Sequence, residues 1–88
     1  MSGWSLETKR DSYDLMNRLE RLGLGPLLKN QDAKLLIRPI YELRPATSRI
    51  LFTIRGGVAW LLRAFKKKSR KTPQHEIDLA KQRANYIP

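Results

Sequence analysis

The residues best suited to chemistry in this chain are cations, and their excess over acidic residues is confined to the middle of the sequence. The 88-residue sequence carries a formal net charge of +10. The segment from Lys34 to Lys71 holds eleven lysines and arginines and a single acid, Glu42, whereas the charges on either side of it cancel. A charge gathered in this way predicts one electropositive face for a polyanion, with an ordinary solvated basic surface as the alternative.

Within this segment two arginines predict a role different from that of the other cations. Arg44 and Arg49 flank a predicted turn at 45–48, so that their guanidinium groups can converge on one phosphate. A guanidinium offers a planar fork to phosphate oxygens and stays charged. The remaining cations are suited to binding a nucleic-acid backbone. They are Arg55, Arg63, Lys66, Lys67, Lys68, Arg70 and Lys71.

Proton transfer at such a site needs other residues, and the sequence offers few. His75 is the only histidine, and imidazole is the side chain that most readily exchanges a proton near neutral pH. Lys67 can take part if neighbouring positive charge favours its neutral amine. Glu42 can act as a base or, alternatively, pair with an adjacent arginine. One histidine and no cysteine exclude thiolate and multi-histidine metal sites, and we expect no cofactor.

Length and hydropathy limit the class of protein further. A chain of 88 residues forms one small domain. Its longest apolar run is far too short to span a bilayer, and its first ten residues lack the apolar core of a signal peptide. We therefore expect a cytoplasmic protein without a membrane partner.

Two helices must frame the cationic segment. An apolar stripe predicts the first helix over 9–23. Its members are Leu15, Leu19 and Leu22. Thr72 as N-cap and Pro73 at the first helical position predict a second helix over 73–86.

Between these helices the pattern predicts a three-stranded antiparallel meander over 40–65, and so an α+β domain. Strict alternation and a Gly56-Gly57 turn of type I′ carry this prediction. The strands are expected at 40–44, 49–55 and 58–65. Residues 27–33 read as a loop, and Pro39, which cannot donate to a ladder, places the first firm strand at Ile40.

The alternation also assigns faces to the predicted sheet. The residues expected in the core are Tyr41, Leu43, Ile50, Phe52 and Ile54. The arginines then share the opposite, solvent-facing surface and form an open basic platform. Val58–Phe65 is apolar enough to lie in the middle of the sheet. On this arrangement Arg49 projects outward, and Arg49→Ala leaves the fold intact.

Five short motifs follow one another in an order and spacing that resemble a known family. They are Y-E-L-R at 41–44, R-I-L-F at 49–52, L-L-R-A-F at 61–65, K-K-S-R-K-T-P at 67–73 and E-I-x-x-A-x-x-R at 76–83. The series is similar to the phage-derived, HigB-like branch of the RelE/ParE toxin superfamily. The resemblance covers residues 34–84, and the run at 67–73 is its most specific part.

The resemblance implies a toxin of a type II toxin–antitoxin pair with a curved antiparallel sheet packed on helices. It implies an antitoxin of the helix-turn-helix type as partner, together with messenger RNA and the ribosome. Arg44 and Arg49 match positions that contact the scissile phosphate in the RNA-cleaving relatives. Compared with the family pattern, the chain is expected to lack the first strand and an extra helix, to carry Arg63 in place of a histidine, and to carry Ile77 in place of a tyrosine.

Three functions remain open on these grounds. The first is a metal-independent endoribonuclease that cleaves ribosome-associated messenger RNA. The second is a non-catalytic basic module that binds RNA or a protein partner on the same fold. The third is inhibition of gyrase, as in ParE-like relatives, because the fold alone does not fix the activity.

Overall fold

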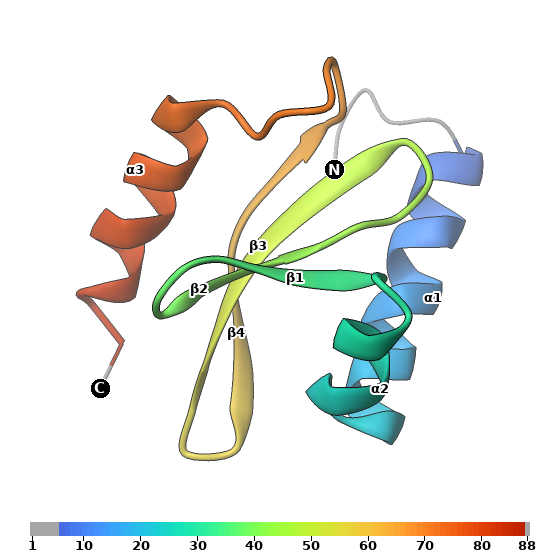
Figure 1. Ribbon diagram of the computed structural model, residues 1–88, viewed down its shortest axis with the longest axis horizontal. Helices are drawn as coiled ribbons and strands as arrows, with labels where there is room; N and C mark the ends of the chain where they lie inside the picture. The colour runs from blue at the N-terminus through green and yellow to red at the C-terminus, as the bar shows by residue number, and fades with distance from the viewer. Residues whose placement is uncertain (1–5, 88) are drawn as a thin grey trace.

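An antiparallel sheet between helices organises the chain (Figure 1). The computed structural model describes residues 6–87. In chain order the elements are α1 (Leu6–Leu22), α2 (Leu24–Lys29), β1 (Ala33–Ile37), β2 (Ile40–Leu43), β3 (Ser48–Arg55), β4 (Val58–Lys66) and α3 (Gln74–Ala84). They form an α+β fold with an antiparallel meander, as predicted. Within these residues no helix is both long and apolar enough to cross a membrane.

The first helix buries a narrower stripe than its sequence predicts. Leu15 and Leu19 lie in the core, whereas Leu22 is exposed. The helix ends there because Gly23 follows with a φ of 81°, and its amide nitrogen donates to the Leu19 carbonyl at 2.9 Å. The following helix, α2, accommodates Pro26 in its first turn, where a backbone N–H has no partner within the helix.

The sheet has four strands within the described residues, so the prediction of three was wrong. The additional strand, β1, pairs antiparallel with β2, and Lys34 lies opposite Glu42. Pro39 had argued against a strand before Ile40, but it lies in the turn between the two strands, where no ladder hydrogen bond is required of it. The period-two pattern that begins at Lys34 therefore belongs to a strand of its own.

The strands follow one another in the order β1-β2-β3-β4. The β3–β4 hairpin has the predicted two-residue turn, with Arg55 opposite Val58. Gly56 and Gly57 have φ values of 59° and 75°, which suit a type I′ turn and which other residues rarely adopt. This hairpin carries the chain from the core back towards the basic cluster.

Helices cover both faces of the sheet, which corrects the predicted open basic platform (Figure 1). One face packs against α1 and α2 through Leu43, Ile50 and Phe52. The opposite face packs against α3, and Leu51 and Ala80 are fully buried between them. Leu51 is the decisive residue, because an apolar side chain between Ile50 and Phe52 is typical of a strand covered on both sides.

The last strand, β4, lies at an edge of the sheet and not in its middle. Among the described strands it pairs only with β3. Val58 and Leu61 are exposed, and a groove of about 600 Å³ separates this part of the hairpin from α1. The apolar sequence of this strand therefore reflects a partly exposed apolar surface as well as core packing.

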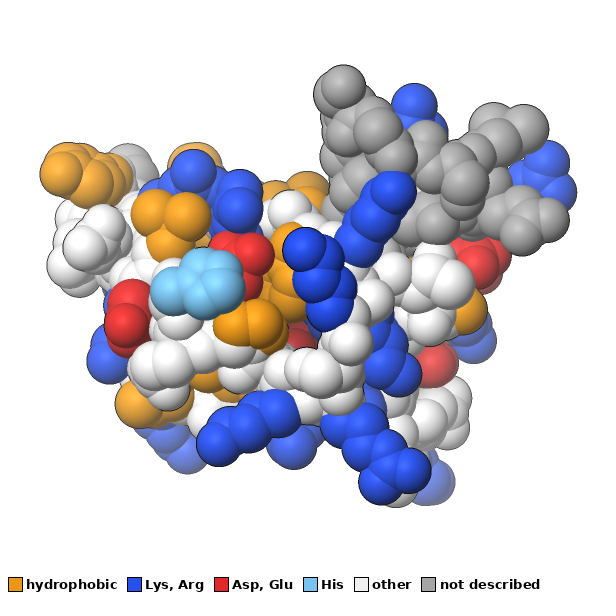
Figure 2. Space-filling model, turned by 90° about the horizontal axis from the view of Figure 1, so that it is seen from above, with side chains coloured by type: hydrophobic (Ala, Val, Ile, Leu, Met, Phe, Trp, Pro, Cys, Tyr) orange, Lys and Arg blue, Asp and Glu red, His pale blue; other side chains and the backbone are white. Residues whose placement is uncertain are grey.

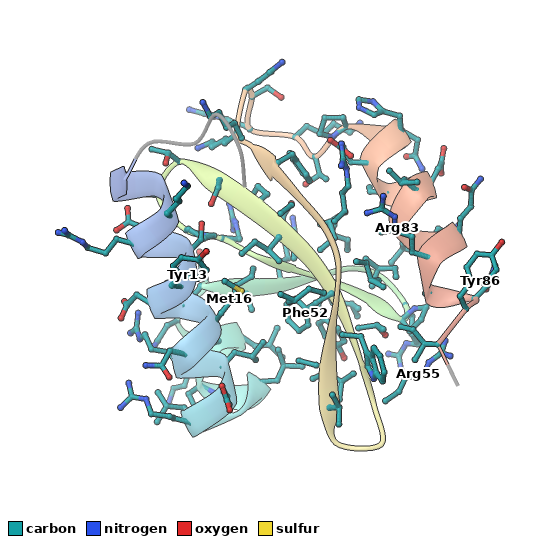
Figure 3. All side chains as sticks on the ribbon, turned by 180° about the vertical axis from the view of Figure 1, so that it is seen from behind. Tyr13, Met16, Phe52, Arg55, Arg83 and Tyr86 are labelled. Atoms are coloured by element: carbon teal, nitrogen blue, oxygen red, sulfur yellow. The ribbon has the colours of Figure 1, made fainter. Side chains whose placement is uncertain are left out.

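A β-bulge interrupts the β3–β4 ladder near its middle. Leu51 lies opposite Arg63 and Phe52 lies opposite Leu61, which leaves Leu62 as an extra residue. Arg83 of α3 reaches towards the sheet (Figure 3) and donates from Nη1 to the Leu62 carbonyl at 2.6 Å. This bond ties α3 to the strand that leads into the basic segment.

Candidate functional site

A cavity of about 280 Å³ lies where β4 ends and the chain turns into α3. The end of the molecule that carries this turn is viewed in Figure 2, and Lys and Arg side chains gather over its centre. The cavity is lined by Arg49, Arg63, Phe65, Lys66, Lys67, Lys68, Ser69, Arg70, Lys71, Thr72, Pro73, His75 and Glu76. Most of the cations predicted to bind a polyanion therefore surround one hollow.

Residues 67–73, here called the basic loop, carry four exposed cations and are fixed at both ends. The Lys67 amide donates to the Thr47 carbonyl at 3.0 Å. At the other end the Thr72 hydroxyl donates to Oε2 of Glu42. Thr72 was predicted to cap α3, but Pro73 occupies the cap position and makes no side-chain cap hydrogen bond. The Thr72 hydroxyl thus binds the sheet and not the helix.

Arg49 lines the cavity but is only 7% exposed, so the predicted outward position was wrong. Its Nη1 donates to the Pro45 carbonyl at 2.7 Å and to the Ser48 carbonyl at 2.6 Å. Burial lowers the pKa of the Arg49 guanidinium below its ordinary value, and the nearby Glu42 carboxylate opposes that shift. The guanidinium is therefore held rigidly in the wall of the cavity.

Glu42 lies between the two arginines that flank the turn at 45–48. Its Oε1 is 3.7 Å from Nε of Arg44 and 3.9 Å from Nε of Arg49. The carboxylate is buried, and it takes the position between two guanidinium groups that was predicted for a phosphate. Of the two alternatives for Glu42, pairing with arginine is the one observed.

Arg44 does not line the cavity of about 280 Å³. It lines a separate hollow of about 350 Å³ beside β1 and α2, together with Lys34 and Leu35. Its Nε is buried and makes no hydrogen bond with the residues that the structure describes. Arg44 thus lies outside the cavity and is linked to it by its ion pair with Glu42 and by charge repulsion with Arg49.

A second buried carboxylate, Glu76, lies in the first turn of α3. Its Oε1 accepts from Nε of Arg63 at 2.5 Å, and its Oε2 accepts from Nη2 of Arg63 at 3.5 Å. Oε2 also lies 3.9 Å from Nε2 of His75. Since His75 is 79% exposed, its imidazole lies at the rim of the cavity beside this carboxylate.

Comparison with protein families identifies the kind of protein that carries this cavity. The sequence model of a family described as phage-derived protein Gp49-like (DUF891) matches residues 1–85. The chain belongs to this family. No curated protein matches the chain. The Gp49-like family is known for RelE/HigB-like toxins, which implies an antitoxin as partner.

The family match agrees in part with the resemblance seen in the sequence. It supports a toxin-like, phage-derived protein. The assignment to the HigB-like branch stays a prediction. The expected lack of the family's first strand and extra helix also stays a prediction.

The structure of this Gp49-like chain gathers most, but not all, of the predicted site residues. Arg49, Lys67 and His75 line one cavity with the cations of the basic loop, whereas Arg44 lies beyond Glu42. Arg55 lies at the opposite end of β3, where its Nη1 donates to the Ile87 carbonyl at 3.2 Å (Figure 3). Arg55 is therefore not part of the cavity.

Sequence reasoning missed two polar residues of this Gp49-like site, Glu76 and Thr72. Both lie in motifs already noted, E-I-x-x-A and K-K-S-R-K-T-P. From the sequence, Glu76 is an acidic residue near the start of the predicted last helix. Nothing near it in the sequence indicated that it pairs with Arg63. Among the residues described, no cluster of three or more His, Cys, Asp or Glu side chains can hold a metal ion.

Proposed function

We propose that this chain is the toxin of a type II toxin–antitoxin pair, of the HigB-like branch, and that it cleaves ribosome-associated messenger RNA in the cytoplasm. The observation that carries the proposal is the single cavity lined by a buried guanidinium, an exposed imidazole and the cations of the basic loop. This combination suits the cleavage of a phosphodiester, because both charge stabilisation and proton transfer contribute to that reaction.

The proposed reaction uses the ribose 2′-hydroxyl as nucleophile and needs no metal ion. The 2′-oxygen loses its proton and attacks phosphorus, the bond to the 5′-oxygen breaks, and that oxygen takes up a proton. The products are a 2′,3′-cyclic phosphate and a 5′-hydroxyl. We assign proton transfer to His75 and Lys67, and stabilisation of the developing phosphate charge to Arg49.

RNA binding in this proposal falls to the exposed cations around the cavity. Lys68, Arg70 and Lys71 are exposed and line it, so they can contact backbone phosphates on either side of the scissile bond. The cognate partner is proposed to be an antitoxin of the helix-turn-helix type with an acidic face. Such a face would neutralise these cations and stabilise the small domain by mass action.

One observation favours a second candidate function, a non-catalytic RNA-binding module. The guanidinium of Arg49 already donates to two carbonyls, and that of Arg63 is paired with Glu76. If neither is free to follow a reacting phosphate, only the exposed cations of the basic loop act, and they bind without cleaving.

Primer-extension mapping of messages on translating ribosomes separates the two functions. Purified chain is added to a stalled ribosome–mRNA complex, with and without EDTA. We expect cuts at fixed codon positions, 5′-hydroxyl ends and no effect of EDTA. His75→Ala is expected to abolish the cuts, and Lys81→Ala, an exposed change on α3 outside the cavity, to leave them unchanged. RNA binding without any cut would support the binding module, and arrest of gyrase without RNA cleavage would exclude both.

A further inference from the structure

Glu42 is a buried acid in the most basic part of the chain. It is the only acidic residue between Lys34 and Lys71, and its side chain is 5% exposed. A buried carboxylate is costly unless charges and hydrogen bonds compensate for the lost hydration. Glu42 has both kinds of partner, and they come from three different parts of the fold.

The two carboxylate oxygens of Glu42 divide these partners between them. Oε1 faces Arg44, directly after β2, and Arg49 in β3. Oε2 accepts the hydroxyl hydrogen of Thr72, which is thirty residues away in the sequence. One side chain therefore links the arginine in the cavity wall to the far end of the basic loop.

The basic loop needs such a link because its own charges oppose its conformation. Lys67, Lys68, Arg70 and Lys71 lie within five residues and repel one another. The Lys67 amide anchors the start of the loop to Thr47, one residue before β3. The bond between Thr72 and Glu42 anchors its end. Both anchors lie beside the segment that carries Arg49.

We infer that Glu42 is a positioning residue that holds the basic loop over Arg49 through the hydroxyl of Thr72. The carboxylate orients the Arg49 guanidinium with one oxygen and fastens the loop with the other. The cations of the loop and the buried guanidinium thus face the same cavity because one carboxylate binds both. The inference rests on the proposed function only for its RNA readout, since the anchoring of the loop does not depend on what the cavity binds.

Thr72 offers the cleaner test, because Glu42→Ala would leave two guanidinium groups without their shared carboxylate and can unfold the chain. Thr72→Val removes the hydroxyl at nearly constant volume, and Thr72→Ser restores it. Thr53→Val is the matched control, because the Thr53 hydroxyl donates to the Pro39 carbonyl at 2.8 Å, a bond outside the basic loop. The purified full chain is used for all variants, and urea unfolding shows that each is folded.

Two measurements distinguish the anchoring of the basic loop by Thr72 from the proposed cleavage of RNA. Trypsin cuts after the exposed cations of the basic loop, and its rate under native conditions reports how often the loop opens. We expect Thr72→Val to raise that rate about tenfold, the effect of losing one hydrogen bond to a charged group. Thr72→Ser should keep the wild-type rate, and Thr53→Val should change the urea midpoint but not the cutting of the loop.

The second readout is RNA cleavage measured as kcat and KM. Thr72→Val should raise KM for RNA more than it lowers kcat. It displaces the binding cations Lys68, Arg70 and Lys71, whereas His75 and Arg49 lie outside the loop and Lys67 is held by the separate bond of its amide to Thr47. Wild-type trypsin rates in Thr72→Val, or equal rates in Thr72→Ser and Thr72→Val, would overturn the inference. A loop that opens in Thr72→Val while the wild-type chain cleaves no RNA would support the anchor and refute the proposed function.

Discussion

At the scale of single residues, two buried carboxylates pair with the basic side chains in and beside the cavity. Glu42 faces Arg44 and Arg49, and Glu76 faces Arg63 and His75. These pairings leave the exposed lysines and Arg70 as the charges that a polyanion meets first. Arginines paired with a carboxylate and exposed cations of the same basic segment therefore have different surroundings, which the sequence alone does not reveal.

Arg49 is expected to matter for stability as well as for activity. Arg49→Ala removes two hydrogen bonds to carbonyls and one of the two arginines that pair with the buried Glu42 carboxylate. We therefore expect a loss of about 3–5 kcal/mol in the free energy of unfolding. Arg49→Lys keeps the charge without the planar fork. We expect it to fold and to cleave RNA about 10²–10³-fold more slowly. Urea unfolding and cleavage rates measure the two effects, and a fully stable Arg49→Ala variant would contradict the observed burial.

Lys68 is expected to behave as a plain phosphate contact. It is exposed and lines the cavity, so Lys68→Ala should weaken RNA binding and reduce the slope of log K against log salt by about 0.7, the value for one phosphate on a single strand. Lys81→Ala, also exposed but on α3 outside the cavity, is the control. Fluorescence anisotropy over a salt series measures both. An unchanged slope in Lys68→Ala would mean that Lys68 does not touch the backbone of the RNA.

At the scale of elements, α3 decides which side of the sheet is available to a ligand. It packs over Leu51 with Ala80 and Ala84, and the cavity lies at the end of this face beyond the helix. Small side chains at positions 80 and 84 let the helix approach the sheet closely. The alternation in the sequence assigned the face with the arginines to solvent, so the cover of this face by α3 was not predicted.

A pair of leucine variants tests the cover by α3. Leu51→Ala removes a fully buried side chain and should lower the free energy of unfolding by about 2–5 kcal/mol. Leu61→Ala removes the same atoms from a residue that is 55% exposed, and we expect a change within about 0.5 kcal/mol, as at most surface positions. Urea denaturation measures both. Equal losses in the two variants would mean that the α3 side of the sheet is not a core.

At the scale of the whole molecule, the net charge of +10 lies on a body of only 32 × 29 × 22 Å. The screening length is about 30 Å at 0.01 M salt and about 8 Å at 0.15 M, so at low salt the cations repel one another across the entire protein. The segment between β4 and α3 and the β3–β4 turn lie at opposite ends of the sheet (Figure 1). The first lines the charged cavity, and the second lines the apolar groove beside α1. The molecule thus presents two chemically different ends.

Screening is therefore expected to stabilise this protein. The urea midpoint should rise as sodium chloride increases from 0.01 to 0.3 M, because salt reduces repulsion within the folded state. A variant with Lys68→Gln and Lys71→Gln, which carries two fewer charges, should show a smaller rise. A midpoint that falls with salt would mean that ion pairs such as Arg63–Glu76 outweigh the repulsion.

The sequence predicted the features that depend on neighbouring residues and missed those that depend on packing. The Gly56-Gly57 hairpin was predictable because both residues need a positive φ. The clustering of cations near residues 63–71 was also visible. By contrast, Glu42 and Thr72 are thirty residues apart, and the bond between them exists only because α3 and the basic loop fold onto the sheet. Pro39 misled the strand prediction for another reason. Proline has no backbone N–H to donate, which a turn tolerates and a strand does not.

The extra residue at Leu62 has a consequence for the phase of β4. Side chains of a strand alternate between two faces, and a bulge sets one extra residue opposite the partner strand, so the odd-numbered residues lie on different faces before and after it. Before the bulge, Ala59 and Leu61 point to the side of α1; after it, Arg63 and Phe65 point to the side of α3. In a strand of the same sequence without the bulge, Arg63 would share the face of Leu61 and point away from Glu76. The bulge absorbs Leu62 as an extra residue, so deletion of Leu62 would restore a regular ladder and keep Arg63 on the side of α3. The bulge thus lets one continuous strand direct Leu61 towards the apolar groove and both Leu62 and Arg63 towards α3.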